Sequence, residues 1–152
     1  MNTASMGGLI MLRTILFSLA MLIATPVLAH AAISADDEKA IDAKVGSFFT
    51  SVQKGDTKGA YDNFMSPTMS EQQQAIRNLI GITDQVVSFF GGPFTYEKVQ
   101  ETELGSRLVF RKYLLQSDKA PYVATMIMYH TSKGWVCQGL YLRDLTQDDF
   151  QP

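Results

Sequence analysis

The sequence is poor in the residues that most often build catalytic and metal sites. Its 152 residues include one cysteine and two histidines. The lone Cys137 cannot form an internal disulfide, and its apolar surroundings favour a small buried hydrophobe over a reactive thiol. His30 lies in an N-terminal segment that we expect to be removed, which leaves only His130. With one histidine and one cysteine left, the chain has too few of the side chains that usually form metal sites and His–Asp dyads, so we expect no metal and no cofactor.

Acidic residues are also missing where an acid–base enzyme of this size would need them. The three strand candidates after position 106 carry no Asp or Glu. A catalytic carboxylate on a sheet requires an apolar pocket, where burial raises its pKa toward neutrality. Glu97, Glu101 and Glu103 lie in the preceding strand candidate, whose polar neighbours indicate a solvated edge. The pattern argues against an enzyme, and a Cys137–His130 thiolate pair is a remote alternative.

The first residues have the composition of a secretory signal peptide. No acidic residue precedes Asp36, and Arg13 stands before an apolar run that ends in Pro26 and small residues. That order of charge, apolar run and small-residue exit is typical of a cleaved leader. Cleavage after Ala29 or after Ala31 fits equally well, and Met6 or Met11 could be the true start. We expect a leader at 1–31, a single domain at 32–152, and export to the periplasm or the medium.

The charge of the remaining chain excludes two classes of partner. Of the 13 Lys and Arg, Arg13 leaves with the leader, so 12 basic residues face 15 acidic ones and the net charge becomes −3. An acidic domain with scattered lysines has no electrostatic footprint for nucleic acid. It also lacks the basic cluster that anionic membranes attract. We therefore expect no nucleic-acid partner and no membrane binding after leader cleavage.

Three helices are predicted before position 93. Apolar residues recur at helical spacing from Ile41 to Val52, and Gly55 ends this stripe. The stretch "KGDTKGAY" at 54–61 has the glycines of a phosphate loop, but a helix precedes it and no hydroxyl residue follows Lys58. It is interpreted as a joint, with Asp56 or Thr57 capping a short second helix that Pro67 ends. Ser70 and Gln73 form a predicted capping box for a third helix, which stops at 91–93.

From position 94 the apolar period changes from 3.6 to 2. Four strands are predicted, at 94–103, 107–116, 122–131 and 135–143, joined by short turns as an antiparallel meander. The acidic tail after 145 is expected to fray. Helices followed by antiparallel strands indicate an α+β fold, with three helices packed on one four-stranded sheet. The strand at 122–131 is apolar on both sides, so the sheet either curls around a cavity or meets another subunit.

Two stretches resemble the nuclear transport factor 2-like superfamily of cystatin-like α+β folds. They are "FFTSVQKGDTKGAYDNF" and "YVATMIMYHTSKGWVCQGLYL", and the likeness covers 36–145, closest to small secreted bacterial members of uncharacterised function. The resemblance implies a cone-shaped cavity between helices and a curved sheet, with homodimers formed through the outer sheet face. The superfamily includes isomerases, hydrolases and non-enzymatic domains, so the likeness does not select a function.

The candidate ligand site consists of residues that we expect to line the cone. It comprises Tyr61, Lys112, Met126, Met128, His130 and Tyr141. A mostly apolar cleft with a few polar groups is typical of small-molecule sites. Alternatively, the methionines are core filler and Lys112 extends to water. The opposite sheet face would carry a candidate interface of Arg111, Tyr113, Tyr129 and Gln138. Both assignments assume a strand without a bulge, because one bulge would exchange the faces.

These patterns support three hypotheses. The first is an exported, non-enzymatic domain that binds a small apolar molecule or a protein partner in or around the cone, as a homodimer. The second is a small isomerase or hydrolase of the ketosteroid-isomerase type. The third is a structural dimer module whose cone is filled by its own side chains. An open, polar-lined cone would favour the first two, and a cone closed by Met126, Met128 and Trp135 would favour the third.

Overall fold

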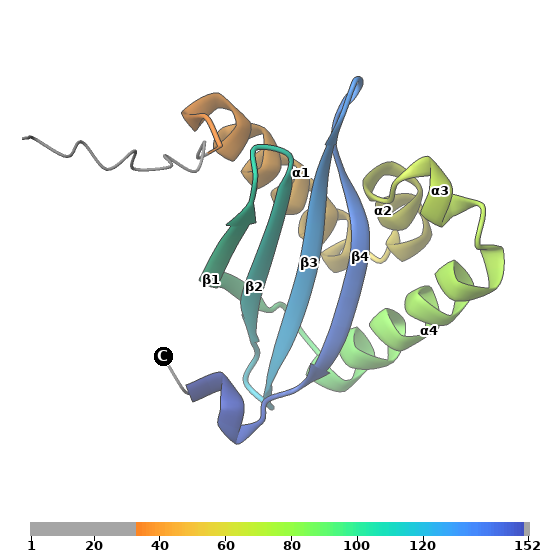
Figure 1. Cartoon of the computed structure of the whole chain (residues 1–152). Helices are drawn as coiled ribbons and strands as arrows, with labels where there is room; N and C mark the ends of the chain where they lie inside the picture. The colour runs from red at the N-terminus through yellow and green to blue at the C-terminus, as the bar shows by residue number, and fades with distance from the viewer. Residues whose placement is uncertain (1–32, 151–152) are drawn as a thin grey trace, which may run out of the picture.

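The chain folds as an α+β domain in which helices cover one side of a four-stranded sheet (Figure 1). The computed structural model describes residues 33–150. The predicted leader and its cleavage site lie outside these residues. The elements are, in order, α1 (Ala35–Gln53), α2 (Thr57–Phe64), α3 (Pro67–Ser70), α4 (Gln73–Phe90), β1 (Thr95–Leu104), β2 (Leu108–Gln116), β3 (Pro121–Thr131), β4 (Gly134–Asp144) and the 3-10 helix η1 (Gln147–Phe150). Within 33–150, no helix has both the length and the apolar character needed to cross a membrane.

Helix α1 is the long central helix, and its predicted apolar stripe is confirmed. All five residues of the stripe are buried, namely Ile41, Val45, Phe48, Phe49 and Val52. The helix begins after Ser34, whose hydroxyl accepts a hydrogen bond from the Asp37 N–H at 3.1 Å. Acidic residues occupy the first turn, where the helix dipole favours negative charge. The stripe packs on the sheet, and α1 runs behind the strands in Figure 1.

The joint between α1 and α2 is confirmed as a helix-to-helix connection. Gly55 takes the left-handed conformation, with φ of 81°, that reverses the chain after α1. The Asp56 carboxylate accepts from the Gly59 N–H at 3.0 Å and caps α2. Ala60, Tyr61 and Phe64 then face the core, as predicted. No phosphate-binding strand–loop–helix unit is present in this part of the chain.

The predicted capping box at Ser70 is wrong, because an additional one-turn helix precedes α4. Ser66 and Pro67 form a cap and first-turn pair that starts α3, and the Ser66 hydroxyl accepts from the Met69 N–H at 3.2 Å. Ser70 is therefore the last residue of α3, and α4 begins after Gln72 without a side-chain cap. The Ser66 N–H also donates to the Cys137 carbonyl at 2.8 Å, so this connection covers the edge of β4.

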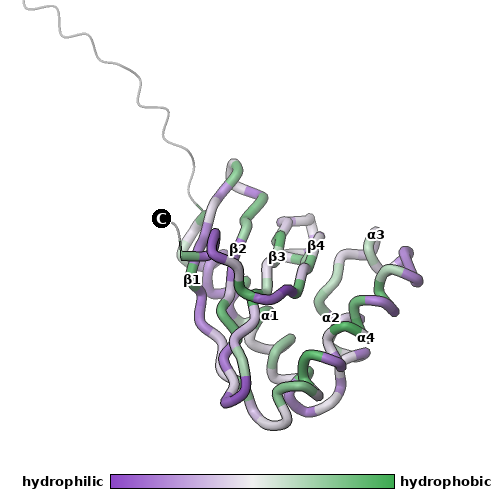
Figure 2. The backbone as a smooth tube through the Cα atoms, turned by 90° about the horizontal axis from the view of Figure 1, so that it is seen from below, coloured by the Kyte–Doolittle hydropathy of each residue, from purple (hydrophilic) through white to green (hydrophobic). Residues whose placement is uncertain are grey.

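The four strands form the predicted antiparallel meander, in the order β1-β2-β3-β4. Their bounds lie within one residue of the predicted ones, because turn residues mark each end. Viewed from below, α2, α3 and α4 lie together on one side of the sheet (Figure 2). Two irregularities interrupt the ladders, one between Lys98 and Gln100 in β1 and one between Ile127 and Met128 where β3 pairs with β4.

Residues 147–150 of the tail form the 3-10 helix η1, in contrast to the predicted frayed end. Asp149 of η1 accepts hydrogen bonds from Arg143 at 2.5 and 2.6 Å and from the Thr146 N–H at 2.9 Å. It also lies 3.2 Å from the ammonium group of Lys112 on β2. Asp149 is one of the acidic residues on which the prediction of a solvated tail rested, and its carboxylate holds the tail against the sheet.

Candidate functional site

The helix-facing side of the sheet is a closed core, and this is where the predicted ligand site was centred. Met126 and Met128 are both 0% exposed and Trp135 is 5% exposed. The space left among the α1, α4 and sheet side chains has a volume of about 10 Å³. That is at most room for a single water molecule. The two methionines therefore fill the core, which is the alternative interpretation of these residues.

Tyr61 belongs to the same core and is satisfied within it. Its side chain is 0% exposed, and its hydroxyl lies 2.7 Å from the Thr83 hydroxyl of α4. Burial raises the pKa of Tyr61 well above its ordinary value, and the hydrogen bond with Thr83, which lowers the pKa, offsets only part of this effect. The phenol is thus a neutral group that links α2 to α4, and its hydroxyl already has a partner.

Cys137 and His130 do not form a thiolate pair. Cys137 is opposite Met128 in the β3–β4 ladder, whereas His130 is opposite Trp135. Burial raises the pKa of the Cys137 thiol to about 12, so the thiol is protonated and unreactive near neutral pH. The His130 ring packs on Trp135 with centroids 5.0 Å apart, and the Trp135 indole donates to the Asp37 carboxylate at 2.8 Å. This group joins the β3–β4 hairpin to the start of α1.

The largest correction concerns Arg111, which was placed on the outer face and is instead the centre of a buried ion-pair cluster. Its side chain is 0% exposed. Its guanidinium donates to Asp42 of α1 at 2.5 Å, and its Nε lies 2.5 Å from Glu101 of β1. Burial lowers the pKa of Arg111, but the Tyr113 hydroxyl and the two carboxylates more than offset this, so the pKa lies above its ordinary value. Arg111 and Tyr113 are therefore core residues and not surface residues.

Glu101 is an ion-pair partner in this cluster, contrary to the predicted solvated edge. Its carboxylate contacts Arg111 and also accepts from Lys98 at 3.0 Å. Both of these contacts are ion pairs, so the Glu101 carboxylate links β1 to Arg111 of β2. Glu101 is therefore part of an ion-pair cluster and does not line the cavities described here.

Lys112 and Tyr141 lie on the outer face, so their assignment to the helix-facing side is also wrong. The ladder aligns Lys112 with Thr125 and Thr125 with Tyr141, and Tyr141 is 59% exposed. For β4 the cause is a bulge at Gln138, which exchanges the faces of the residues that follow it. For β2 the apolar residues fill both phases of the strand, so the periodicity alone could not assign the faces.

The outer face carries an apolar groove that the sequence interpretation did not identify. Two rows of facing residues cross the strands here, Leu104–Leu108–Tyr129 and Thr102–Phe110–Ile127. The groove has a volume of about 420 Å³ and is lined by Thr102, Glu103, Leu104, Leu108, Phe110 and Ile127. Leu104 is 71% exposed. The signal for this groove in the sequence was that the third predicted strand is apolar on both sides. The residues of the second strand were assigned to the wrong faces, so Phe110 was expected on the helix-facing side.

Of the candidate interface residues, Tyr129 lies beside this groove, opposite Leu108 in the β2–β3 ladder. Tyr129 is 36% exposed, and the Arg107 guanidinium lies 5.2 Å from its ring centroid. Gln138 is half-buried in the bulge of β4. A stacked arginine and an aromatic ring are residue types enriched in protein interfaces. The outer face thus combines an apolar centre with a polar and aromatic border.

Within 33–150, no group of three His, Cys, Asp or Glu side chains is arranged to hold a metal ion. The sheet therefore has a filled core on its helix-facing side and an apolar groove on its outer face. Comparison of the chain with protein-family models, curated proteins and solved structures finds no match.

Proposed function

We propose that this chain is an exported, non-enzymatic interaction domain that binds a protein partner through the outer face of its sheet, in the first place a second copy of itself. The observation that carries the proposal is the apolar groove of about 420 Å³ around Leu104, Phe110 and Ile127. Soluble monomers rarely leave a contiguous apolar patch on a sheet uncovered. A homodimer would cover it with the same patch of a second chain.

The tail limits the patch and gives it a polar border. Asp149 is fastened to Lys112 and Arg143, so η1 lies over one part of the outer face. Val123 is 2% exposed there without belonging to the main core cluster. The groove lies beyond this covered part, two ladder positions from Lys112. An apolar centre with a charged rim is the anatomy of a protein–protein interface.

The filled core supports this choice over a small apolar ligand in the cone. The interior space of about 10 Å³ cannot admit an organic molecule without displacing side chains. The α+β architecture is compatible with the nuclear transport factor 2-like likeness, which implies dimers of this kind. The predicted leader supports a periplasmic or extracellular location. The proposal therefore combines the partner-binding part of the first hypothesis with the structural dimer module of the third.

The test is the mass of the native protein, produced from the full-length chain, as a function of concentration. Sedimentation equilibrium or light scattering should give a dimer that dissociates on dilution, and Leu104→Asp should give a monomer. Leu104 is 71% exposed, so the substitution should leave the fold intact by circular dichroism. Ile82→Asp is the matched control, since Ile82 is 44% exposed on α4, away from the groove. A wild-type monomer at all concentrations, or equal effects of both variants, would contradict the proposal.

A further inference from the structure

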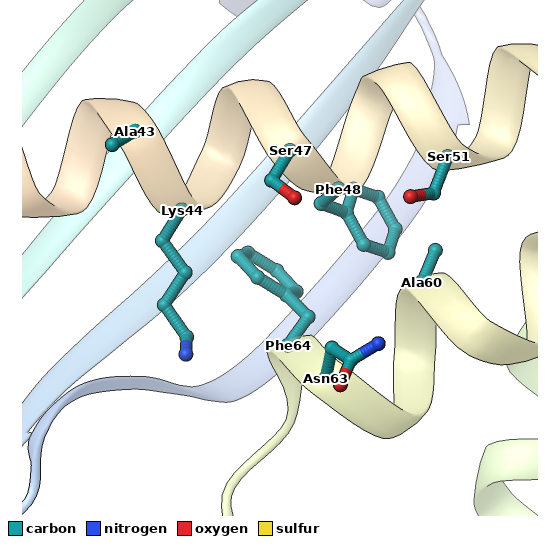
Figure 3. Close-up of a pocket in the computed structure, with 8 residues that line it drawn as sticks. All are labelled: Ala43, Lys44, Ser47, Phe48, Ser51, Ala60, Asn63 and Phe64. Carbon is teal, nitrogen blue, oxygen red and sulfur yellow. The ribbon is translucent and has the colours of Figure 1, made fainter.

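A second concave site lies between α1 and α2, on the side of these helices away from the sheet core. It has a volume of about 320 Å³ and is lined by Ala43, Lys44, Ser47, Phe48, Ser51, Ala60, Asn63 and Phe64. Figure 3 shows Lys44, Ser47 and Ser51 extending from α1 toward Asn63 and Phe64 of α2. No residue predicted from the sequence to bind a ligand lines this cleft.

The floor of the cleft is aromatic. The rings of Phe48 and Phe64 stack with centroids 4.5 Å apart and an interplanar angle of 30°. Phe48 also meets Tyr61 edge to face, with centroids 5.2 Å apart, which holds its ring in place. Small residues at 43, 47 and 51 recur every fourth position of α1 and border this floor, in which Phe48 and Phe64 are 4% and 1% exposed. A planar apolar group can pack on such a rigid floor at little entropic cost.

The rim of the cleft supplies a cation and polar groups that are free to bind. Within 33–150, no carboxylate lies within ion-pair distance of Lys44. By contrast, Lys58 of α2 is paired with Asp62 at 2.5 Å. Asn63 donates one hydrogen bond to the Gly59 carbonyl at 2.9 Å, which leaves its second N–H available. Ser47 adds a hydroxyl that can donate.

We infer that this cleft binds a small monocarboxylic acid that carries an apolar ring. One ammonium group with hydroxyl and amide donors suits the single charge of a carboxylate, whereas a phosphate group is more often bound by several cations or an arginine fork. The ring would occupy the cleft above the buried Phe48 and Phe64, and the carboxylate would lie against Lys44. A volume of about 320 Å³ matches a ligand at the small end of the range for protein pockets. The site is independent of the outer sheet face and of dimer formation.

The experiment is an NMR titration of the protein, produced from the full-length chain, with phenylacetate as the probe and phenylacetamide as its neutral analogue. Phenylacetate should shift the amide signals of Ser47, Ser51 and Asn63, and should bind at least tenfold more tightly than phenylacetamide. Lys44→Met should reduce phenylacetate affinity at least tenfold. Lys39→Met is the matched control, since Lys39 lies on α1 outside the cleft and its side chain is 80% exposed. It should leave the affinity unchanged.

A second variant separates loss of the site from loss of the fold. Ser47 is exposed at the cleft, so Ser47→Phe should fill the space without disturbing the core. Its spectrum should remain that of a folded protein while the shifts caused by phenylacetate disappear. A dissociation constant of about 1 mM or below is expected. The proposal is overturned if phenylacetate at about 10 times that concentration shifts no amide signal of the wild type. It is equally overturned if the amide binds as tightly as the acid, or if Lys44→Met and Lys39→Met behave alike.

Discussion

On the helix-facing side of the sheet Arg111 is a charged residue with 0% of its side chain exposed, while on the outer side Leu104 is an apolar residue with 71% exposure. Each is the opposite of what its side-chain chemistry alone favours. Arg111 is stabilised inside because Asp42 and Glu101 supply charges from α1 and β1. No described residue between 33 and 150 covers Leu104 in a comparable way. The difference separates a completed core from the exposed apolar surface that we propose as an interface.

The neighbouring strand positions repeat this contrast at each step of β2. Val109, Arg111 and Tyr113 are buried under the helices, and the intervening Phe110 and Lys112 are only half-buried. The helix-facing positions are therefore expected to determine the stability of the monomer. The outer positions are expected to contribute less to stability and more to association. Substitutions at adjacent positions can test this directly, because neighbouring residues of one strand lie on opposite faces of the sheet.

The largest effect should come from Arg111→Ala. It leaves Glu101 and Asp42 without their shared cation and opens a cavity in the core, so we expect a loss of about 3 kcal/mol in the free energy of unfolding. Lys112→Ala removes the adjacent cation on the other face and should lose less than about 1 kcal/mol. Urea denaturation measures both. Equal losses would show that the two faces do not differ in this way.

The ion-pair cluster itself allows a sharper version of this test. The Nη2 atom of Arg111 has no hydrogen-bond partner among the described residues, which reduces the benefit of burying the charge. Replacing Arg111 and its less exposed partner, with Arg111→Met and Glu101→Gln in one chain, leaves only the 56% exposed Asp42 without its cation. The double variant should therefore recover at least half of the stability lost in Arg111→Ala. If the double variant is no more stable than Arg111→Ala, neither the cavity nor the unpaired Glu101 charge accounts for the loss.

A smaller difference is expected between Met126→Ala and Ile127→Ala. Met126 is 0% exposed in the core, so its truncation should lose about 3 kcal/mol, whereas half-buried Ile127 should lose about 1 kcal/mol. Both are best measured by urea denaturation in the Leu104→Asp background, in which self-association should not contribute. Ile127→Ala should in turn weaken the dimer of the otherwise wild-type chain, while Met126→Ala should not do so once folded. The reverse assignment would contradict the two-face comparison.

The sequence predicted the elements well because their signals are local. Helix stripes, the turn residues and the change of period at position 94 are each contained within a few residues. The extra helix α3 was missed because Ser66-Pro67 was interpreted only as a stop, although the same pair also starts a turn.

The faces of the strands were predicted poorly because they depend on contacts far apart in the sequence. Arg111 is buried only because Asp42 lies 69 residues away on the chain and 2.5 Å away in space. The bulge at Gln138 exchanged the faces of the end of β4, which strict alternation cannot foresee. The cleft between α1 and α2 was missed because its rim residues are small or polar, which is typical of a solvated helix face, and because Phe48 and Phe64 were assigned to the core.

The smallest expected effect concerns the clamp that holds the tail on the outer face. Hydrogen bonds from Arg143 and the Thr146 N–H, with Lys112 nearby, hold the pKa of Asp149 well below its ordinary value. A carboxylate with a lowered folded pKa stabilises the fold above its unfolded pKa of about 3.9, and this contribution is lost as the pH falls through the folded value. Thermal melts should therefore show wild type more stable than Asp149→Asn at pH 6, with the difference shrinking below pH 4. Asp148→Asn is the control for an exposed neighbour, and a gap between wild type and Asp149→Asn that is constant from pH 6 to pH 2 would contradict the clamp.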